Sequence, residues 1–348
     1  MKYDYIVIGQ GIAGSCLAFE LLKRDRSILL FDQPDENISS RIAPGIFNPV
    51  TGKNLVLTWK AHVLFDYFHE FYVEFEKSVR KKILYNKNIY RPFLTIHEQN
   101  DWMGKSTSSN YLPFVQDIHP PKFYDQYIHD PLGGVEIKHS GHIDIQMFLD
   151  CIKEILIAKE AYIEEHFEVD LLQAQNSQLY YKNLETKNLI FCDGPNNHEN
   201  KYFSHLPFSM IKGELLTIET SIKLPVIFNR GVFVHPLKNN ICKVGSTYEL
   251  NPINVKPSEI GRNQLISQLG QLLKIKYKIL DHTAGIRPTT RDRRPFIGKH
   301  PNYPQIGIFS GLGTKGVSLS PYFSKQLVDF FENGKELDRE VDIKRYFG

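Results

Sequence analysis

The stretch Tyr5-Ile6-Val7-Ile8-Gly9-Gln10-Gly11-Ile12-Ala13-Gly14 decides the fold that we expect for this chain. Its first four residues form a short apolar run, which predicts a buried parallel strand. The glycines that follow have the pattern G-x-G-x-x-G, and leucines at helical spacing predict a helix over residues 15–24. A strand, a glycine loop and a helix in this order are typical of a dinucleotide-binding βαβ unit.

Each part of this segment suits a cofactor that carries a pyrophosphate. Gly9 permits a tight turn, Gly11 lets the backbone approach the phosphates, and Gly14 lets the helix pack closely on the strand. The start of the helix presents free N–H groups and the positive end of the helix dipole. A second apolar strand over residues 27–31 ends at Asp32, where an acid accepts hydrogen bonds from the adenosine ribose and argues against a 2′-phosphate.

Length and composition predict an α/β protein of two domains. The chain has 348 residues, of which 42% are apolar and 23% charged, with a net charge of +3. This charge neither requires nor excludes nucleic acid, and no apolar run is long enough to span a membrane. The apolar stretch at residues 6–8 is too short for a signal peptide, and widely spaced cysteines predict buried free thiols, so we expect a cytoplasmic protein. Without a C-x-x-C or H-E-x-x-H motif, no metal site is predicted.

The middle of the chain alternates between helical and strand patterns, which predicts two domains that interleave in sequence. Aromatic residues at helical spacing predict a helix over 59–82, and Asp144 and Ser258 are expected to cap the starts of two further helices. Asn239-Asn240 between two apolar runs predicts a hairpin. The remaining strands are expected at residues 93–96, 134–137, 167–172, 178–181 and 189–192, the last ending in Asp193-Gly194.

A second glycine-rich segment lies near the C-terminus. A predicted strand at residues 306–309 is followed by Gly311-Leu312-Gly313-Thr314-Lys315-Gly316 and by a helix expected from about Ser320, with Pro321 in its first turn. The chain therefore offers two helix starts to a ligand. We expect one at the pyrophosphate and the other at a distal, electron-accepting ring.

These segments together resemble the D-amino-acid oxidase and glycine oxidase family of FAD-dependent oxidoreductases, from Tyr5 to about Phe331. The motifs that carry the resemblance, in order, are the N-terminal fingerprint, the loop at residues 45–49, Gly141-His142-Ile143-Asp144, Val244-Gly245-Ser246-Thr247, the Gly285-Ile286-Arg287-Pro288 to Gly298 segment and residues 311–321. The resemblance implies a Rossmann-like FAD-binding domain over 1–76, 140–208 and 284–348. It also implies a smaller antiparallel-sheet substrate domain over 77–139 and 209–283. No cysteine lies near Arg287, so the FAD is expected to be non-covalent.

The resemblance also assigns site residues. Arg287 matches the family arginine that grips a substrate carboxylate, and Lys315 is the cation expected to stabilise charge on the reduced flavin. Phe233 stands where relatives carry an active-site tyrosine, so His235 or Tyr248 is expected to line the pocket instead. An internal ion pair that ties the domains together is the alternative for Arg287. The expected cofactor-binding residues are Gly9, Gly11, Ile12, Ala13, Gly14, Asp32, Gln33, Arg41, Ala43, Gly45, Ile46, Phe47, Val169, Asp193, Gly194, Arg287, Gly311, Gly313, Thr314, Lys315, Gly316 and Val317.

The implied activity is oxidation of the C–N bond of an amino acid or an N-substituted glycine. The resemblance implies hydride transfer to flavin N5, hydrolysis of the imine, and reoxidation by O2 or another electron acceptor. A first alternative is a tRNA wobble-uridine modification oxidase that acts on a carboxymethylaminomethyl group, with phosphate contacts from the basic residues of 77–82 and from Arg291, Arg293 and Arg294. The simpler interpretation of the cluster at 77–82 is a solvated helix C-terminus with a favourable dipole interaction. A second alternative is a flavin-binding module without turnover.

Overall fold

The strand of the N-terminal fingerprint, β1 (Lys2–Ile8), is the centre of a parallel sheet. The computed structural model describes all residues except 34–38, 53–55, 251, 253 and 348. From one edge to the other, the parallel strands are β11 (Tyr162–Glu164), β2 (Ile28–Asp32), β1, β14 (Leu184–Phe191) and β22 (Ile306–Ser310). This is the strand order of a dinucleotide-binding half-fold, extended by one strand beyond β14. Antiparallel strands β12 (Leu172–Gln175), β13 (Gln178–Tyr181) and β21 (Phe296–Lys299) complete the sheet.

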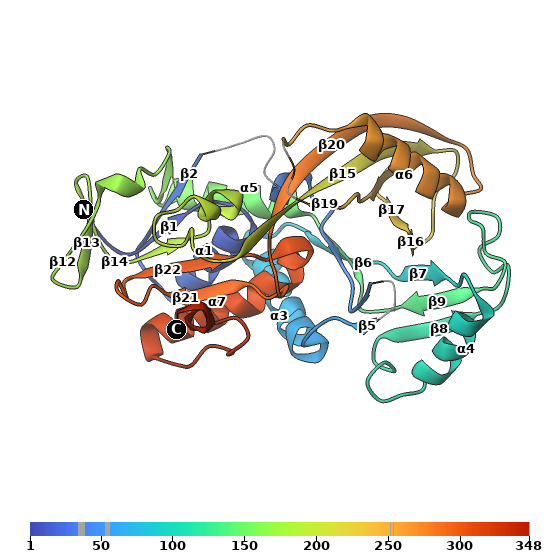
Figure 1. Cartoon of the computed structure of the whole chain (residues 1–348), viewed down its shortest axis with the longest axis horizontal. Helices are drawn as coiled ribbons and strands as arrows, with labels where there is room; N and C mark the ends of the chain where they lie inside the picture. The colour runs from blue at the N-terminus through green and yellow to red at the C-terminus, as the bar shows by residue number, and fades with distance from the viewer. Residues whose placement is uncertain (34–38, 53–55, 251, 253, 348) are drawn as a thin grey trace.

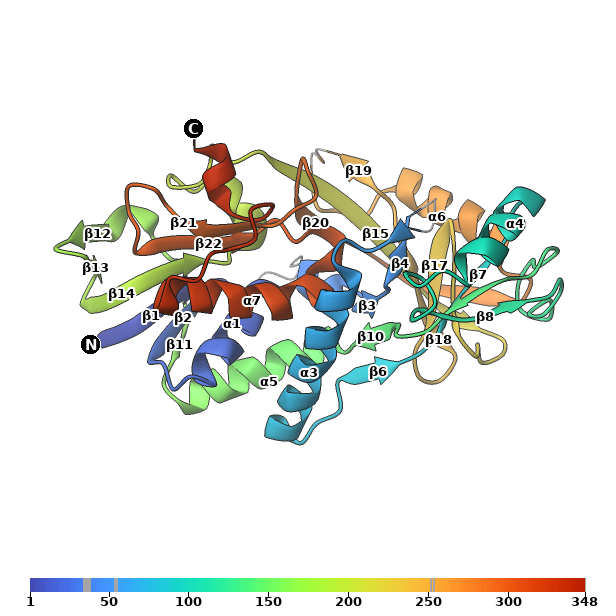
Figure 2. The same cartoon turned by 90° about the horizontal axis from the view of Figure 1, so that it is seen from below.

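Four helices bury one apolar face of this sheet, which carries Val7, Leu30 and Ile190. Figures 1 and 2 show α1 (Ile12–Leu22) packed beside α5 (Ile145–Ala158) and α7 (Gly316–Asn333), with α3 (Ala61–Val79) crossing α7. The aromatic stripe of α3 is fully buried against this layer, as its spacing predicted. The helix is shorter than the expected 59–82 because Lys60 and Arg80, at its two ends, both adopt left-handed backbone conformations with φ of 54°.

Helix α7 begins at Gly316, earlier than the expected Ser320, so Pro321 lies inside the helix rather than in its first turn. Proline has no N–H to donate to the carbonyl four residues before it, which belongs to Val317. The Tyr72 hydroxyl of α3 donates to that carbonyl at 3.1 Å instead. The contact between two helices therefore replaces the hydrogen bond that the proline removes.

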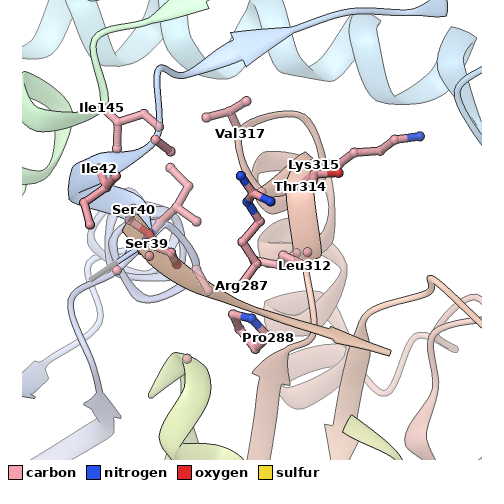
Figure 3. A pocket seen from close by; sticks show the side chains of 18 of the residues that line it. Ser39, Ser40, Ile42, Ile145, Arg287, Pro288, Leu312, Thr314, Lys315 and Val317 are labelled. Carbon is pink, nitrogen blue, oxygen red and sulfur yellow. The ribbon is translucent and has the colours of Figure 1, made fainter. Parts of the chain in front are cut away.

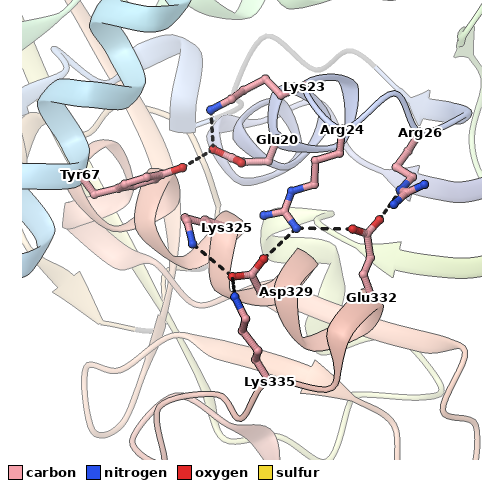
Figure 4. Close-up of polar contacts among 9 residues, drawn as sticks. All are labelled: Glu20, Lys23, Arg24, Arg26, Tyr67, Lys325, Asp329, Glu332 and Lys335. Atoms are coloured by element: carbon pink, nitrogen blue, oxygen red, sulfur yellow. Dashed lines mark hydrogen bonds and ion pairs between the residues drawn. The ribbon is translucent and has the colours of Figure 1, made fainter.

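An ion-pair cluster joins α1 to α7 at the far end of the same layer (Figure 4). Asp329 of α7 accepts from Arg24 at 2.8 Å and from Lys325 and Lys335 at 3.1 Å each. Tyr67 of α3 donates to the buried Glu20 of α1 at 2.6 Å. Three helices that lie far apart in sequence are thus tied together by charged groups as well as by their apolar faces.

The second sheet is mixed and mainly antiparallel, and it occupies the other end of the molecule (Figure 1). Its long strands β15 (Phe208–Thr220) and β20 (Tyr277–Thr290) pair along almost their full length. The other strands are β7 (Ile89–Pro92), β8 (Val115–His119), β9 (Gly134–Ile137), β16 (Ile227–Arg230), β17 (Val232–Pro236), β18 (Ile241–Gly245) and β19 (Glu249–Leu250). Helices α4 (Ile96–Lys105) and α6 (Glu259–Leu272) belong to this half. Strand β20 runs through residue 284, where a domain boundary was expected.

Short elements connect the two halves or lie close to them. They are the small sheet of β3 (Ile46–Phe47), β10 (Gly141–Ile143) and β6 (Leu84–Asn86), the pair β4 (Val50–Thr51) and β5 (Val56–Leu57), helix α2 (Ser39–Ile42), and the 3₁₀ turns η1 (Val169–Leu171), η2 (Gly194–His198), η3 (Gly313–Lys315) and η4 (Ile343–Tyr346).

The β17–β18 hairpin turns at Asn239 and Asn240, both with positive φ, as predicted. Asp144 and Ser258 cap α5 and α6, also as predicted.

Two expected strands are wrong. Residues 93–96 contain the start of α4, because the Thr95 side chain accepts the Glu98 amide at 3.1 Å and caps the helix. Residues 169–171 form η1, and a strand begins only at Leu172.

Each cysteine is buried as a free thiol. Among the described helices, none is long and apolar enough to cross a membrane. Within the same residues, His, Cys, Asp and Glu side chains form no group of three or more that could hold a metal ion.

Candidate active site

A cavity of about 580 Å³ lies where the carboxyl ends of β1, β2, β14 and β22 meet the second sheet. Its wall is made of segments from both ends of the chain, including residues 9–13, 42–48, 193–196 and 309–318. Figure 3 shows the labelled side chains of α2, α5, β20 and the 312–317 segment around it. Ligands of open α/β sheets bind at this edge, outside the carboxyl ends of the strands.

The fingerprint glycines form a cradle at one end of the cavity. Gly9 has a φ of +95°, a conformation that favours glycine, and a side chain at Gly14 would lie 1.9 Å from the Gly9 carbonyl oxygen. Gly14 itself lies beneath the cavity wall, where it lets α1 approach β1. Gly9, Gly11, Ile12 and Ala13 line the cavity at the N-terminus of α1, so this cradle fits a pyrophosphate.

Two acids lie beside this cradle, Asp32 at the end of β2 and Asp193 just after β14, and these two strands flank β1. Asp32 Oδ1 accepts the Gln10 amide at 2.8 Å and Oδ2 accepts the Tyr162 hydroxyl at 3.3 Å, while burial raises the pKa of the carboxyl group. Burial and the neighbouring Asp32 raise the pKa of Asp193 to about 6. Gln33 and Gly194 complete this side of the wall. Acceptors at this position suit the hydroxyls of an adenosine ribose.

The expected flavin-facing loops lie at the other end of the cavity. Ala43, Gly45, Ile46 and Phe47 line it, and a side chain at Gly45 would lie 1.9 Å from the Ile143 carbonyl oxygen. Opposite this loop, the segment that leads into α7 contributes its glycines and their neighbours, namely Gly311, Gly313, Thr314, Lys315, Gly316 and Val317. Burial lowers the pKa of Lys315, and Arg294 and Arg293 nearby lower it further.

Arg287 extends from β20 into the cavity. Figure 3 shows that the Lys315 side chain points away from Arg287. In the part of the chain that the structure describes, the Arg287 guanidinium has no ion pair, and its buried Nη1 has no hydrogen-bond partner. Burial lowers the pKa of Arg287. The internal ion pair considered for this residue is therefore absent from the described residues. The acids among the described lining residues are Asp32 and Asp193, both on the opposite sheet.

Several expected site residues lie outside the cavity lining. Arg41 points to α5, where it pairs with Asp150 at 2.8 Å, and Val169 opens η1. His235 is fully buried beside His142, with 4.3 Å between ring centroids, and burial lowers its pKa to about 2. Tyr248 is 54% exposed. Of the three residues weighed for this part of the pocket, the structure places only Phe233 in the wall.

Sequence reasoning missed the polar residues of the second sheet that line the cavity. Asn229 of β16 lies directly opposite Phe233 of β17, which in turn lies opposite Gly245, the neighbour of Ser246. Directly paired residues on neighbouring strands share a face, so Asn229 could have been found once the pairing of Phe233 was known. Gly213 and Leu215 of β15 and Thr51 of β4 also line the cavity and were missed.

The fold and this site define a dinucleotide-binding protein whose cavity is closed on one side by a second sheet. The family model for FAD dependent oxidoreductases, DAO, matches residues 4–330. The glycine oxidase of Bacillus subtilis strain 168 is 22% identical, over 97% of this chain and 95% of that protein. The structure of glycine oxidase from Bacillus cereus ATCC 14579 aligns with a TM-score of 0.78 at 17% identity, covering 96% of each chain.

A second kind of relative is longer than this chain. The tRNA 5-methylaminomethyl-2-thiouridine biosynthesis bifunctional protein of Legionella pneumophila strain Philadelphia 1 is 21% identical over 97% of this chain. The match covers 54% of that protein, so the chain spans about half the length of these curated relatives.

The chain belongs to the DAO family of FAD-dependent oxidoreductases. Its cofactor is therefore FAD, and the glycine cradle, the two acids beside it and the second glycine segment fit that cofactor. Membership of this enzyme family also argues against a flavin-binding module without turnover.

Proposed function

We propose that this enzyme oxidises the C–N bond of a small amino acid or an N-substituted glycine. The observation that carries the proposal is the unpaired guanidinium of Arg287 in the cavity wall. An arginine without a counter-ion in a partly buried site is costly, and an anionic ligand removes that cost. A carboxylate fits best, because the planar guanidinium makes two parallel charge-assisted hydrogen bonds to it.

The remaining lining residues support an amine bound in its neutral form. Around Arg287, the described wall is made of apolar or uncharged residues such as Phe233, Leu215, Asn229 and Ser246. None of these carries a negative charge that would favour an ammonium group. When bound, FAD accepts the two electrons of the oxidation. Lys315 and the start of α7 supply positive potential at one end of the cavity, which suits a group that gains negative charge.

The test is a reduction screen of the purified yellow protein without oxygen. Glycine, sarcosine, iminodiacetate and D- and L-amino acids are added in turn, and loss of the visible flavin absorbance reports turnover. Methylamine and dimethylamine are matched controls, because they keep the C–N bond and lack the carboxylate. The proposal expects bleaching by at least one carboxylate-bearing amine and none by the controls, and equal bleaching by both groups contradicts it.

Replacement of Arg287 tests the assigned residue directly. We expect Arg287→Ala to raise the KM for the best substrate by ~10²-fold or more, because the charge-assisted pair is lost. Arg287→Lys keeps the charge and loses the two-pronged geometry, so its KM should lie between those of the wild type and the alanine variant. An unchanged KM in Arg287→Ala rejects the carboxylate-binding role.

A modified tRNA is a second candidate substrate, and the loop after β20 favours it. Arg291 and Arg293 are exposed in this loop, and Arg293 and Arg294 lie close enough to Lys315 of the cavity wall to lower its pKa. A tRNA whose phosphates bind at this loop would place the modified base of a nucleotide near Arg287. By contrast, Lys81 and Lys82 at the end of α3 pair with Glu154 and Glu76, so half of that basic cluster is neutralised.

Salt dependence separates this candidate from small-molecule oxidation. If tRNA is the substrate, its affinity falls steeply with salt, and Arg291→Ala/Arg293→Ala lowers both the affinity and the salt slope. Lys81→Ala/Lys82→Ala at the end of α3, where both charges are already paired with Glu154 and Glu76, is the matched control and should leave both nearly unchanged. Binding that is insensitive to salt, or equally affected by the two double variants, rejects the tRNA reading.

A further inference from the structure

We propose that Gly213 is a positioning residue for Arg287: its missing side chain leaves the space in which the guanidinium lies. This inference rests on the proposed carboxylate-binding role of Arg287. It goes beyond that role because Gly213 is 74 positions away in the sequence, on a different strand, and makes no bond to a ligand of its own.

The Arg287 guanidinium occupies the space in which a side chain at position 213 would begin. A Cβ atom built on Gly213 would lie 1.9 Å from Arg287 Nη2, 2.2 Å from Cζ and 2.3 Å from Nη1. These three guanidinium atoms are its nearest neighbours, and all three belong to one side chain. Gly213 pairs with Gly285 across the β15–β20 ladder, two residues from Arg287, so the arginine side chain lies over the sheet at a pair of glycines.

Conformational freedom does not explain this glycine. The φ angle of Gly213 lies outside the positive range that disfavours other residues, so alanine fits its backbone without strain. The space above it is therefore what the residue supplies. An alanine there must displace the guanidinium by about 1.5 Å, the difference between 1.9 Å and an ordinary contact of 3.4 Å.

The strand itself is held too firmly to move in place of the arginine. Lys212 and Glu214, on either side of Gly213, are almost fully buried on the opposite face and pair with each other at 3.4 Å. Glu214 also accepts the Ser258 amide at 3.0 Å and its hydroxyl at 2.8 Å, at the start of α6. The Glu214 amide donates to Thr247 at 2.9 Å. We therefore expect the end of the flexible Arg287 side chain to move, rather than the strand.

A displaced guanidinium still carries its charge but no longer meets the carboxylate in the same place. Misplacement of a binding group by about 1 Å can cost ~10²-fold in rate. We therefore expect Gly213→Ala to lower kcat/KM for a carboxylate substrate by ~10- to 100-fold, mainly through KM. It should also weaken an unreactive carboxylate inhibitor such as acetate, followed by its perturbation of the flavin spectrum, by a similar factor.

The decisive experiment is a double-mutant cycle of Gly213→Ala and Arg287→Ala in the FAD-loaded enzyme, with Gly270→Ala as control. Gly270 in α6 has no heavy atom within 4 Å of its built Cβ, so its alanine variant should behave as wild type. If Gly213 acts through Arg287, Gly213→Ala raises KM and the acetate dissociation constant in the wild-type background. In the Arg287→Ala background it changes neither by more than about twofold.

The outcomes distinguish the carboxylate-binding role of Arg287 from the positioning role of Gly213. If Arg287→Ala leaves KM unchanged, the proposed function fails. If Arg287→Ala raises KM but Gly213→Ala does not, or if the effect of Gly213→Ala persists without the arginine, the positioning role is overturned. Should Gly213→Ala fail to fold, recovery of folding in the double variant supports the clash with Arg287, and failure of both variants overturns it.

Discussion

At the scale of single residues, the closest test of the cofactor site is Gly14. Its α-hydrogen faces the Gly9 carbonyl, and a methyl group would lie 1.9 Å from that oxygen. Because the oxygen belongs to the backbone, Gly14→Ala must push α1 away from β1 and open the cradle. We expect the FAD dissociation constant, measured by flavin titration of the apoprotein, to rise by ~10²-fold or more. Gly104→Ala, in open space on α4, is the control, and near-normal FAD affinity in Gly14→Ala contradicts the cradle.

Asp193 predicts a pH dependence of the stability of the apoprotein. Its pKa is raised to about 6, mainly by burial, against an ordinary value of 3.8. The charged form is therefore unfavourable in the folded state above pH 6, and this penalty disappears as the pH falls from 6 to 4. We expect Asp193→Asn to stabilise the apoprotein by about 2 kcal/mol at pH 8 and by close to nothing at pH 4. Urea unfolding at both pH values measures the difference, and a pH-independent effect contradicts the prediction.

Residue types with a demanding chemistry were the ones that could be predicted from the sequence. The glycines of both loops, Asp32 and Arg287 line or support the cavity because their roles depend on backbone freedom or charge. Arg41 and His235 were expected there from their positions in the family motifs. Their side chains point elsewhere, Arg41 to Asp150 and His235 to His142, and that direction is set by neighbours in space rather than in sequence.

At the scale of elements, the hydrogen bond between α3 and α7 should make a measurable contribution to the free energy of unfolding. The Tyr72 hydroxyl replaces the backbone donor that Pro321 lacks, and the ring is fully buried. Tyr72→Phe leaves the Val317 carbonyl without this donor, so we expect a loss of about 1 to 2 kcal/mol in the free energy of unfolding. Tyr180→Phe, at an exposed position of β13, is the matched control and should change stability by less than about 0.5 kcal/mol. Equal effects of both variants contradict a role for the Val317 contact.

The ion-pair cluster of α1 and α7 predicts a second pH dependence, of opposite sign. Burial alone would raise the pKa of Asp329, but Lys335, Lys325 and Arg24 outweigh it and lower the pKa to about 2. The stabilisation is therefore complete above pH 4 and is lost as the pH falls towards 2. We expect Asp329→Asn to cost about 2 kcal/mol at pH 7 and little at pH 2.

Asp150, whose pair with Arg41 is solvent-exposed, provides the control for that experiment. Asp150→Asn should change the free energy of unfolding by well under 1 kcal/mol at either pH. If the two variants have the same effect at pH 7, the cluster at Asp329 contributes no more than an ordinary surface pair. Thermal or urea unfolding of the apoproteins measures both.

Helices and their caps were predictable where the signal is local. Asp144 and Ser258 satisfy the first turns of α5 and α6 within three residues of sequence. The same kind of signal was present at Thr95, followed by Glu98, and was overlooked in favour of a strand. Long-range strand pairing is different, because the register of β15 with β20 joins segments that are far apart in the sequence. Gly213 lies beside the Arg287 side chain only through that register.

At the scale of the whole molecule, one cavity collects residues from the first 50 and the last 40 positions of the chain. The parallel sheet makes this possible, because β1 and β22 flank β14 and end at the same edge. The order of motifs therefore predicted a discontinuous nucleotide-binding half, whereas the substrate-facing wall depends on how the second sheet closes over it. That closure joins β20, which carries Arg287, to the segment that leads into α7.

A ligand that contacts both ends of the chain should stabilise the whole fold. FAD present at 100 times its dissociation constant adds about 2.7 kcal/mol to the free energy of unfolding, if it binds only the folded protein. We expect the melting temperature of the apoprotein to rise by several degrees on addition of FAD, and both termini to become more resistant to limited proteolysis. The rise should be lost in Gly14→Ala, whose cradle is distorted, and kept in Arg287→Ala, whose cavity retains the cradle and both glycine segments. A rise that disappears in Arg287→Ala would mean that this arginine holds the cofactor rather than the substrate.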